Sequence, residues 1–327
     1  MDEKQATPAS YAHFEEDAPQ SWLRVALQFV AIPLIIVGVA VGLYLGINLL
    51  LGAGPKTSAD FVELLRSDTI NRRWQAAFEL AARLATEEEG VPAEFRDPDL
   101  ARALCAALDD ARAERDDPPR LAILVLGILR RLQDPSTLPA VRSALDDPHP
   151  WVRSHAVVTI GALKDEESRP RLLELARHDD AGTRQASLQA LVLLDQVDGM
   201  PFRLSGPTRE VALAHVGDPA EDVRFTAALV LADAGEREAA LPVLRTMLDR
   251  SYLDRFDFND QWGALDAYRL RSGILLKAIQ RAVALRLGDD PEVVAALKRL
   301  TDDGIEGDLE VREAARDALK DLEPKTE

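Results

Sequence analysis

The stretch AEDVRFTAALVLADAG (Ala220–Gly235) carries the pattern that decides the fold. An acidic turn is followed by Val-Arg, by an alanine three residues after the arginine, and by an apolar run. The same order occurs in HPWVRSHAVVTIGALKD (His149–Asp165) and in LEVREAARDALKDL (Leu309–Leu322). A pattern that recurs along a chain of 327 residues predicts an array of similar units rather than one globular core.

The chain from Ser58 onward is typical of helices. Apolar residues recur at spacings of three and four, and no stretch alternates with period two for long enough to indicate a strand. Clusters of Asp and Pro separate the runs, and because Asp caps helices and Pro suits a first turn, each cluster ends one helix and begins the next. First helices are expected near Ser58, Asp99, Thr137, Ser168, Pro207, Glu236 and Pro291, and second helices near Asn71, Pro119, Pro150, Ala181, Pro219, Gly263 and Leu309.

These units resemble the HEAT repeat over roughly residues 58 to 322. In that family each unit is an antiparallel helix pair, and a signature of Asp, Val-Arg and Ala opens the second helix. Asp222, Val223, Arg224 and Ala227 carry this signature most clearly. The resemblance implies an all-α fold, an α-solenoid of six or seven helix pairs. A single pair cannot bury its own apolar face, so the pairs must stack.

The arginine of each signature is expected to have a structural role. A small residue three positions later lets neighbouring helices approach, and the guanidinium can reach the acidic turn of an adjacent unit. The turn residues Asp146, Asp147, Asp179, Asp180 and Asp218 are placed to accept it. We call the five residues in this position the repeat-ladder arginines: Arg73, Arg153, Arg184, Arg224 and Arg312.

The N-terminal part predicts a membrane anchor. Between Arg24 and Lys56, 31 residues carry no charged side chain, and about 20 apolar residues suffice to cross a bilayer. The acidic start differs from the basic start of a signal peptide. We therefore expect a short acidic tail (residues 1–22), one transmembrane helix in contact with the lipid bilayer (residues 23–53) and a solenoid (residues 54–325). This architecture is similar to that of membrane-anchored HEAT-repeat proteins of bacteria.

The predicted span carries two further signals. Gly38, Gly42 and Gly46 form GxxxGxxxG, which favours a homodimer or docking on another spanning helix. Glycine is also common in membrane helices without any such role. More Lys and Arg residues follow the span than precede it, which favours a single-pass protein with its solenoid in the cytoplasm.

One segment interrupts the repeat rhythm. An aromatic-rich insertion covers residues 250–262. Insertions in solenoids often lie on the binding face, and aromatic rings are frequent at interaction hot spots. Alternatively, these rings fold back and fill a gap between unequal helices. The candidate partner-binding residues are Tyr252, Phe256, Phe258, Trp262 and Tyr268.

Motifs for catalysis, metals and cofactors are missing from the sequence. It contains no HExxH, CxxC, GxxxxGK[ST], GxGxxG or GxSxG. We expect no enzyme activity, no catalytic residue, no bound metal and no cofactor. Cys105 is expected to be a small buried hydrophobe rather than a nucleophile. A net charge of −17 argues against a nucleic-acid partner.

The resulting hypothesis is a non-catalytic, membrane-anchored scaffold that binds a partner protein through its solenoid surface. An accessory subunit of a membrane transporter or envelope complex is its most specific form. Two alternatives stay open at this point: a lyase-type enzyme acting on a bound chromophore, and a purely structural homo-oligomer.

Overall fold

The computed structural model describes residues 37–39, 41–43, 57–86, 90–114, 118–255 and 264–323. The chain divides into two compact units, Met1–Pro55 and Lys56–Glu327. In the first unit residues 37–39 and 41–43 are helical, and the rest of the predicted span and the predicted acidic tail lie outside the described residues. Within the part described, no helix combines the length and apolar character needed to cross a bilayer.

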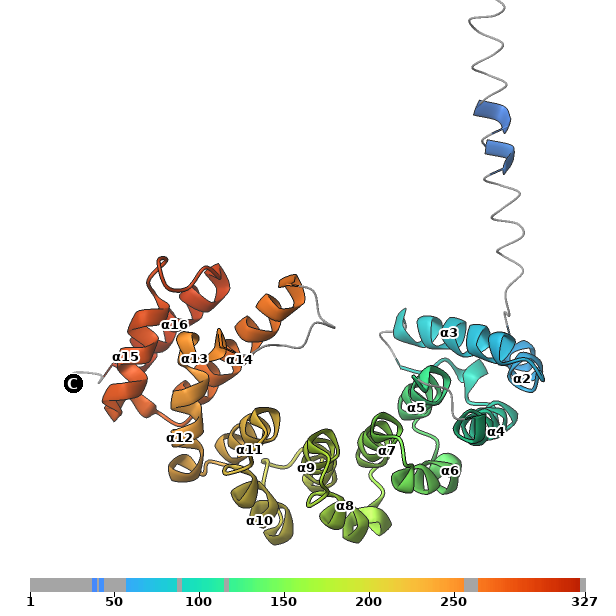
Figure 1. The fold of residues 1–327 in the computed structure, drawn as a ribbon, viewed down its shortest axis with the longest axis horizontal. Helices are drawn as coiled ribbons and strands as arrows, with labels where there is room; N and C mark the ends of the chain where they lie inside the picture. Colours follow the sequence, from blue (N-terminus) through green and yellow to red (C-terminus); the bar gives the residue numbers. More distant parts are fainter. Residues whose placement is uncertain are drawn as a thin grey trace, which may run out of the picture. The chain divides into compact units, whose positions relative to one another are not determined.

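The second unit is a solenoid of helix pairs, which confirms the predicted all-α repeat fold (Figure 1). Its described residues form seven pairs, and each helix begins within two residues of its expected position. No strand occurs among the residues described. The pairs are α2 (Ser58–Leu65) with α3 (Ile70–Thr86), α4 (Pro98–Glu114) with α5 (Arg120–Leu132), α6 (Leu138–Ser143) with α7 (Pro150–Ala162), α8 (Arg169–Leu175) with α9 (Ala181–Asp195), α10 (Gly206–His215) with α11 (Glu221–Asp233), α12 (Arg237–Met247) with α14 (Ala264–Ala284), and α15 (Pro291–Leu300) with α16 (Leu309–Leu322).

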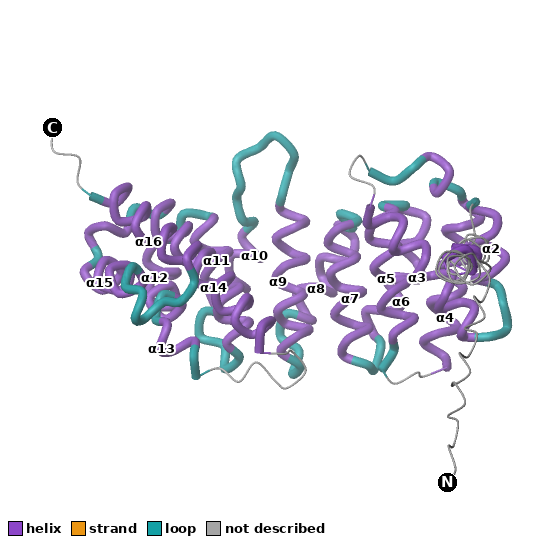
Figure 2. Tube along the Cα trace, turned by 90° about the horizontal axis from the view of Figure 1, so that it is seen from above, coloured by secondary structure: helices purple, strands orange, loops and turns teal. Residues whose placement is uncertain are grey.

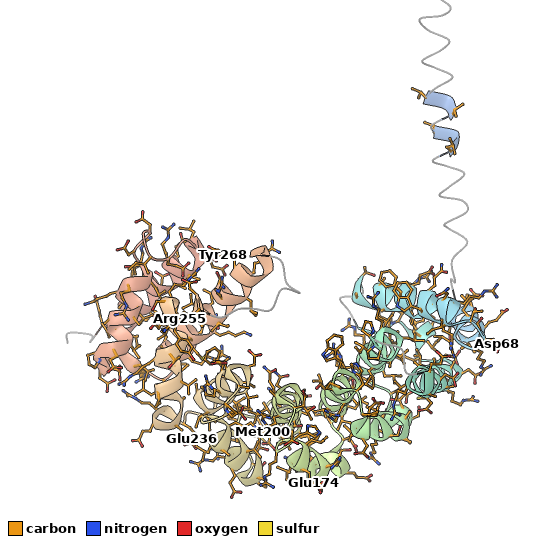
Figure 3. The ribbon with its side chains drawn as sticks, in the orientation of Figure 1. Asp68, Glu174, Met200, Glu236, Arg255 and Tyr268 are labelled. Atoms are coloured by element: carbon orange, nitrogen blue, oxygen red, sulfur yellow. The ribbon has the colours of Figure 1, made fainter. Side chains whose placement is uncertain are left out.

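The helices of this unit lie in two rows. The second helices α3, α5, α7, α9, α11, α14 and α16 pack each against the next and form an inner row along the concave side (Figure 1). The first helices form an outer row, on which Glu174 and Glu236 lie (Figure 3). Because all seven pairs share this arrangement, the inner row offers one surface made from several units.

The helix starts follow from the Asp and Pro clusters. Asp180 accepts a hydrogen bond from the backbone N–H of Thr183 at 2.7 Å, and Asp290 accepts from those of Glu292 and Val293 at 3.1 and 3.0 Å. These bonds satisfy N–H groups that have no partner within the first turn. The turns also contain the short helices η1 (Ala93–Phe95), η2 (Pro135–Thr137), η3 (Ala144–Asp146), η4 (Glu166–Ser168), η5 (Leu287–Asp289) and α13 (Arg250–Leu253).

The core is continuous from Phe61 in α2 to Ala318 in α16. The small residue of each signature is fully buried, as Ala156 and Ala227 illustrate. Helices α7 and α9 approach each other closely, because a Cβ added at Gly161 would lie 2.6 Å from the Cα of Ala190. Small side chains therefore set the spacing between neighbouring units.

One connection is much longer than the others in this part of the array. Residues 196–205 form a projecting loop between α9 and α10 (Figure 2). Asp195 holds its base, because it accepts from the backbone N–H of Ser205 at 2.9 Å and from Arg169 at 2.9 Å. The loop exposes Val197 and Met200 and lengthens the interval between the arginines at 184 and 224.

Candidate functional site

The first feature of the candidate site is a pair of exposed aromatic rings on α3. Trp74 and Phe78 are stacked, with ring centroids 5.3 Å apart and an interplanar angle of 14°. They are 40% and 53% exposed. Residues four apart share one helix face, so two large apolar rings stand side by side in solvent on the inner row.

A groove continues from this stack. We define the inner groove as a hollow of about 310 Å³ between α3, α5 and α7. Ala81 and Ala85 lie seven and eleven residues after Trp74 and therefore on the same face of α3. The lining of the inner groove is mostly apolar: Ala81, Leu84, Ala85, Ile123, Leu124, Gly127 and Ile128, with Arg130, Arg131 and His155.

Helix α7 forms the far wall of the groove. Trp151 is 48% exposed and contacts the His149 ring edge-on at a centroid distance of 5.6 Å. His155, one turn later, lines the groove. Partial desolvation, and secondarily the Arg130 charge, lower the pKa of His155 below its usual range. Its imidazole is therefore neutral at neutral pH and adds little charge to the groove.

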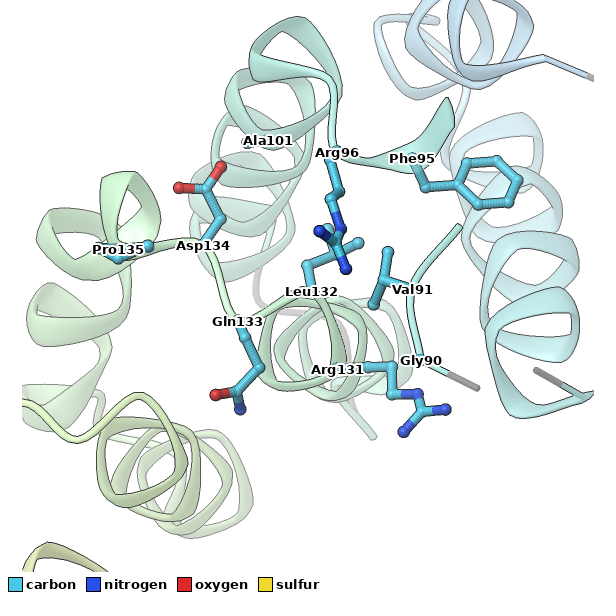
Figure 4. A pocket seen from close by; sticks show the side chains of 10 residues that line it. All are labelled: Gly90, Val91, Phe95, Arg96, Ala101, Arg131, Leu132, Gln133, Asp134 and Pro135. Carbon is cyan, nitrogen blue, oxygen red and sulfur yellow. The ribbon is translucent and has the colours of Figure 1, made fainter. Parts of the chain in front are cut away.

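A larger hollow of about 460 Å³ lies at the end of α5, beside η1 (Figure 4). Its lining mixes Phe95 and Leu132 with the side chains of Arg96, Arg131 and Asp134. Asp134 is already engaged, since it accepts from the backbone N–H of Ser136 at 2.8 Å. The described lining contains no thiol, hydroxyl or imidazole that could act as a nucleophile or base.

A third hollow of about 410 Å³ contains Cys105, between α4 and the start of α6. Desolvation, followed by the charges of Asp109 and Asp134, raises the pKa of the Cys105 thiol to about 11. The thiol is therefore protonated at neutral pH and is a poor nucleophile. Across the described residues, no group of three or more His, Cys, Asp or Glu side chains is placed to hold a metal ion.

Arg73 and Arg184 join their own unit to the next one through carboxylates. Arg73 on α3 donates to Asp110 at 3.0 Å and also pairs with Glu114, both on α4. Arg184 on α9 binds both carboxylate oxygens of Asp218 at 2.8 and 2.7 Å, in the turn before α11. Both guanidinium groups thus bridge consecutive helix pairs.

Arg153 and Arg224 bind the backbone of their own turn and also contact the next unit, through Thr183 of α9 and through the Tyr252 hydroxyl at 3.3 Å. Arg153 donates to the backbone carbonyl of Asp147 at 2.8 Å and to Thr183 Oγ1 at 3.0 Å. Arg224 donates to the backbone carbonyl of Asp218 at 2.6 Å. Arg312 has a buried Nε with no hydrogen-bond partner among the described residues.

The aromatic residues predicted to bind a partner lie only in part within the described chain. Tyr252 packs on the core, and its hydroxyl donates to Glu221 at 3.3 Å. Tyr268 is half-buried with the Arg250 guanidinium over its ring, 5.8 Å from the centroid. Phe256, Phe258 and Trp262 lie outside the described residues.

The predicted helix-dimerisation face belongs to the first unit. Gly38 and Gly42 are helical, and a Cβ added to either would meet nothing within 4 Å among the described residues. Gly46 lies outside the described residues.

The sequence patterns discussed above did not identify Phe78, Leu124 or His155 as surface residues. The helix periodicity does contain a signal that identifies such surface residues. Three inner helices each present exposed or half-buried residues at i, i+4, i+7 and i+11. We call these the inner stripes: Trp74, Phe78, Ala81 and Ala85 on α3; Arg120, Leu124, Gly127 and Arg131 on α5; Trp151, His155, Val158 and Ala162 on α7.

Comparison with solved structures finds other helical proteins. The complex of CpcE and CpcF of phycocyanin lyase from Nostoc sp. PCC7120 is similar at 19% identity and a TM-score of 0.47, over 83% of this chain and 96% of that one. Human deoxyhypusine hydroxylase in complex with glycerol is similar at 16% identity and a TM-score of 0.35, over 81% and 96%. Both identities and both scores are too low to carry an argument about activity.

Sequence comparison identifies the repeat itself. No curated protein sequence matches the chain. The family profile described as HEAT repeats matches residues 103–192, which run from α4 through α9. The matched segment contains the copies of the signature around Arg153 and Arg184 and three of the inner helices. Residues 103–192 of this chain therefore match the HEAT-repeat family.

Proposed function

We propose that this chain is a non-catalytic, membrane-anchored adapter that holds a partner protein on the inner surface of its first three helix pairs. The observation that carries this proposal is the exposed Trp74–Phe78 stack beside the inner groove. Large aromatic side chains normally lie inside a fold or at an interface. Here two stacked rings and an apolar hollow share one surface.

The physical argument concerns the water-exposed apolar area. Burying apolar surface contributes roughly 25 cal/mol per Å², and exposed Trp and Phe rings together offer a large area. Trp and Tyr are the aromatic residues most often found at interaction hot spots. Since α3, α5 and α7 pack in series, an occupant of the groove would contact three repeat units at once.

The chemistry of the described hollows supports a binding role over a catalytic one. The Cys105 thiol is held protonated by its surroundings, and the lining of the hollow beside η1 offers cations and a capping carboxylate. The groove itself contains one neutral imidazole and two arginines among apolar groups. These groups suit recognition of a partner surface.

The membrane part of the proposal depends on the uncharged run between Arg24 and Lys56. In this proposal residues 23–53 span the bilayer, the glycine face supports a homodimer, and the solenoid lies in the cytoplasm beside a transporter or envelope complex. A tag placed after Glu327 tests the orientation. Protease should remove the tag only in inverted vesicles, and removal only in spheroplasts would contradict the cytoplasmic placement.

A photo-crosslinking amino acid at position 78 tests the adapter function in cells. The expected result is one adduct of defined mass, whose yield falls when Trp151→Ala is added. The matched control places the same crosslinker at Arg177, an exposed residue that follows α8 in the outer row. Equal adducts from both positions, or none from position 78, would refute binding on the inner surface.

A further inference from the structure

Carboxylates are nearly missing from the inner helices that face the groove. The chain has 56 Asp and Glu residues among 327. Helices α5 and α7 contain none, α3 contains Glu79, which accepts from Gln75 at 3.3 Å, and the next inner helix, α9, contains only Asp195, its last residue. The Asp195 side chain is buried and bound by Arg169 and by the backbone of Ser205. The inner surface of α5, α7 and α9 therefore presents no carboxylate to solvent.

Cations remain on the same surface. Arg120 and Arg130 lie at opposite ends of α5, and both are exposed. Neither forms a salt bridge with any residue that the structure describes. Arg131, also exposed, follows in the same stripe as Arg120 and Leu124. The apolar centre of the surface is therefore flanked at each end by positive charge.

The outer row shows the opposite pattern. Arg102 pairs with Asp99 on the same helix. Arg171 pairs with Asp146 and Glu174, both at 2.6 Å. Arg102 and Arg171 of the outer row thus have acidic partners, whereas Arg120 and Arg130 of α5 form no salt bridge with the described residues.

We infer that the inner groove receives an acidic, amphipathic segment of a partner protein. Its bulky apolar side chains would pack on Trp74, Phe78 and the groove, and its carboxylates would pair with Arg120 and Arg130. This inference rests on the proposed function and names the chemistry of the partner. The net charge of −17 does not prevent it, because free charges are screened beyond about 8 Å at physiological salt.

The inner stripes also indicate the length of the segment. Packed helix axes lie roughly 8–10 Å apart, so a segment that crosses α3, α5 and α7 spans about 16–20 Å. That span corresponds to about 11–13 residues of helix or about six residues of extended chain. A flat bilayer is a poorer fit, since these helices line the concave side of the solenoid (Figure 1).

Random peptides displayed on phage and selected on the full-length protein in detergent test this inference. We expect the selected peptides to combine Asp or Glu with Leu, Phe or Trp. Their synthetic versions should bind about 10-fold more weakly to Phe78→Ala and to the double variant Arg120→Glu/Arg130→Glu. The matched control Arg177→Glu should not change binding, and circular dichroism should show equal helix content in all variants.

Several results would overturn the inference. Selection of basic or uncharged peptides, selection of no peptide, or equal binding to the double variant would each do so. Sedimentation with phosphatidylserine vesicles that depends on Arg120 and Arg130, without selection of acidic peptides, would assign the surface to lipid. A position-78 cross-link that persists in the double variant would keep the adapter function and remove only the acidic partner class.

Discussion

Two contacts, one in the middle and one at the end of the solenoid, differ in kind, although Arg153 of α7 also donates to Thr183 of α9 at 3.0 Å. Between α7 and α9 the backbones nearly touch, with Gly161 against Ala190 and no polar side chain at the closest approach. Among α12–α16 a buried ion pair forms the link, in which Arg250 binds both carboxylate oxygens of Glu306 at 2.9 and 2.8 Å. The Glu306 side chain is 0% exposed.

This difference shows how an insertion changes a repeat. Where the units follow one another regularly, small residues at matching positions allow close apolar packing. After α12 the chain adds α13 and further residues before α14, so the next helix cannot follow at the regular interval. Charged side chains from distant positions connect the helices there, as Arg250 and Glu306 illustrate. Buried charges of this kind depend on their partners far more than apolar contacts do.

Breaking the buried ion pair should have the largest effect. In Arg250→Met, Glu306 would remain buried without its counter-charge, and α12–α16 should lose about 3–5 kcal/mol of local stability. Faster amide hydrogen exchange confined to these helices would report the loss. Arg209→Met, which breaks the more exposed pair with Glu236, serves as control and should change exchange little. Equal effects of both variants would show that burial of the Arg250–Glu306 pair does not decide its contribution to stability.

The next largest loss of stability should come from adding a side-chain atom at the contact between Gly161 and Ala190. Gly161→Ala places a Cβ 2.6 Å from the Ala190 Cα and should cost about 1–3 kcal/mol in the urea unfolding of the middle units. Gly127→Ala on α5 is the matched control, because a Cβ there meets nothing within 4 Å among the described residues. The control should gain about 0.5–1 kcal/mol from helix propensity. A loss of stability in both variants would show that the close approach of α7 and α9 does not cause the effect.

Acid should destabilise the end of the solenoid, because a carboxylate, Asp290, contributes to its stability. The contact between Gly161 and Ala190 contains no titratable side chain. The pKa of Asp290 lies below its usual value, and the main cause is the hydrogen bond that Arg245 donates to it. The stabilisation from Asp290 is therefore complete above the unfolded pKa near 4 and is lost as pH falls through the lower folded value. The protection factors of the α15 amides, which correct for the intrinsic pH dependence of exchange, should fall with acid in the wild type, and less so in Asp290→Asn. An unchanged pH dependence in the variant would disprove this role.

The smallest expected effect is a change in the pKa of His155, the α7 residue that lines the inner groove. The Arg130 charge is the second cause of the lowered pKa of His155, after desolvation. Arg130→Gln should therefore raise that pKa part of the way toward the usual value of about 6.5. NMR titration of the imidazole measures it, and Arg177→Gln should leave it unchanged. A lower pKa in Arg130→Gln would show that Arg130 does not act through its charge.

Much of the fold could be predicted because its signals are local. An Asp-Pro cluster marks a helix start through its own capping bonds, as at Asp290, and the signature around Arg224 marks a second helix. The inner groove could not be found in this way. Leu124 and Leu126 belong to one apolar run, yet Leu124 is half-buried at the groove whereas Leu126 is fully buried. Nothing in the run distinguishes them without the neighbouring helices.

The sequence was sufficient for the order of the helices, their starts and their stacking into repeats, because capping, periodicity and small-residue spacing act within one unit. The packing of separate units decided the rest. It placed Phe78, Leu124 and His155 on one surface, although they belong to three helix pairs. It also left Arg120 and Arg130 exposed and enclosed Glu306. Exposure depends on which neighbours cover a side chain, and those neighbours lie tens of residues away along the chain.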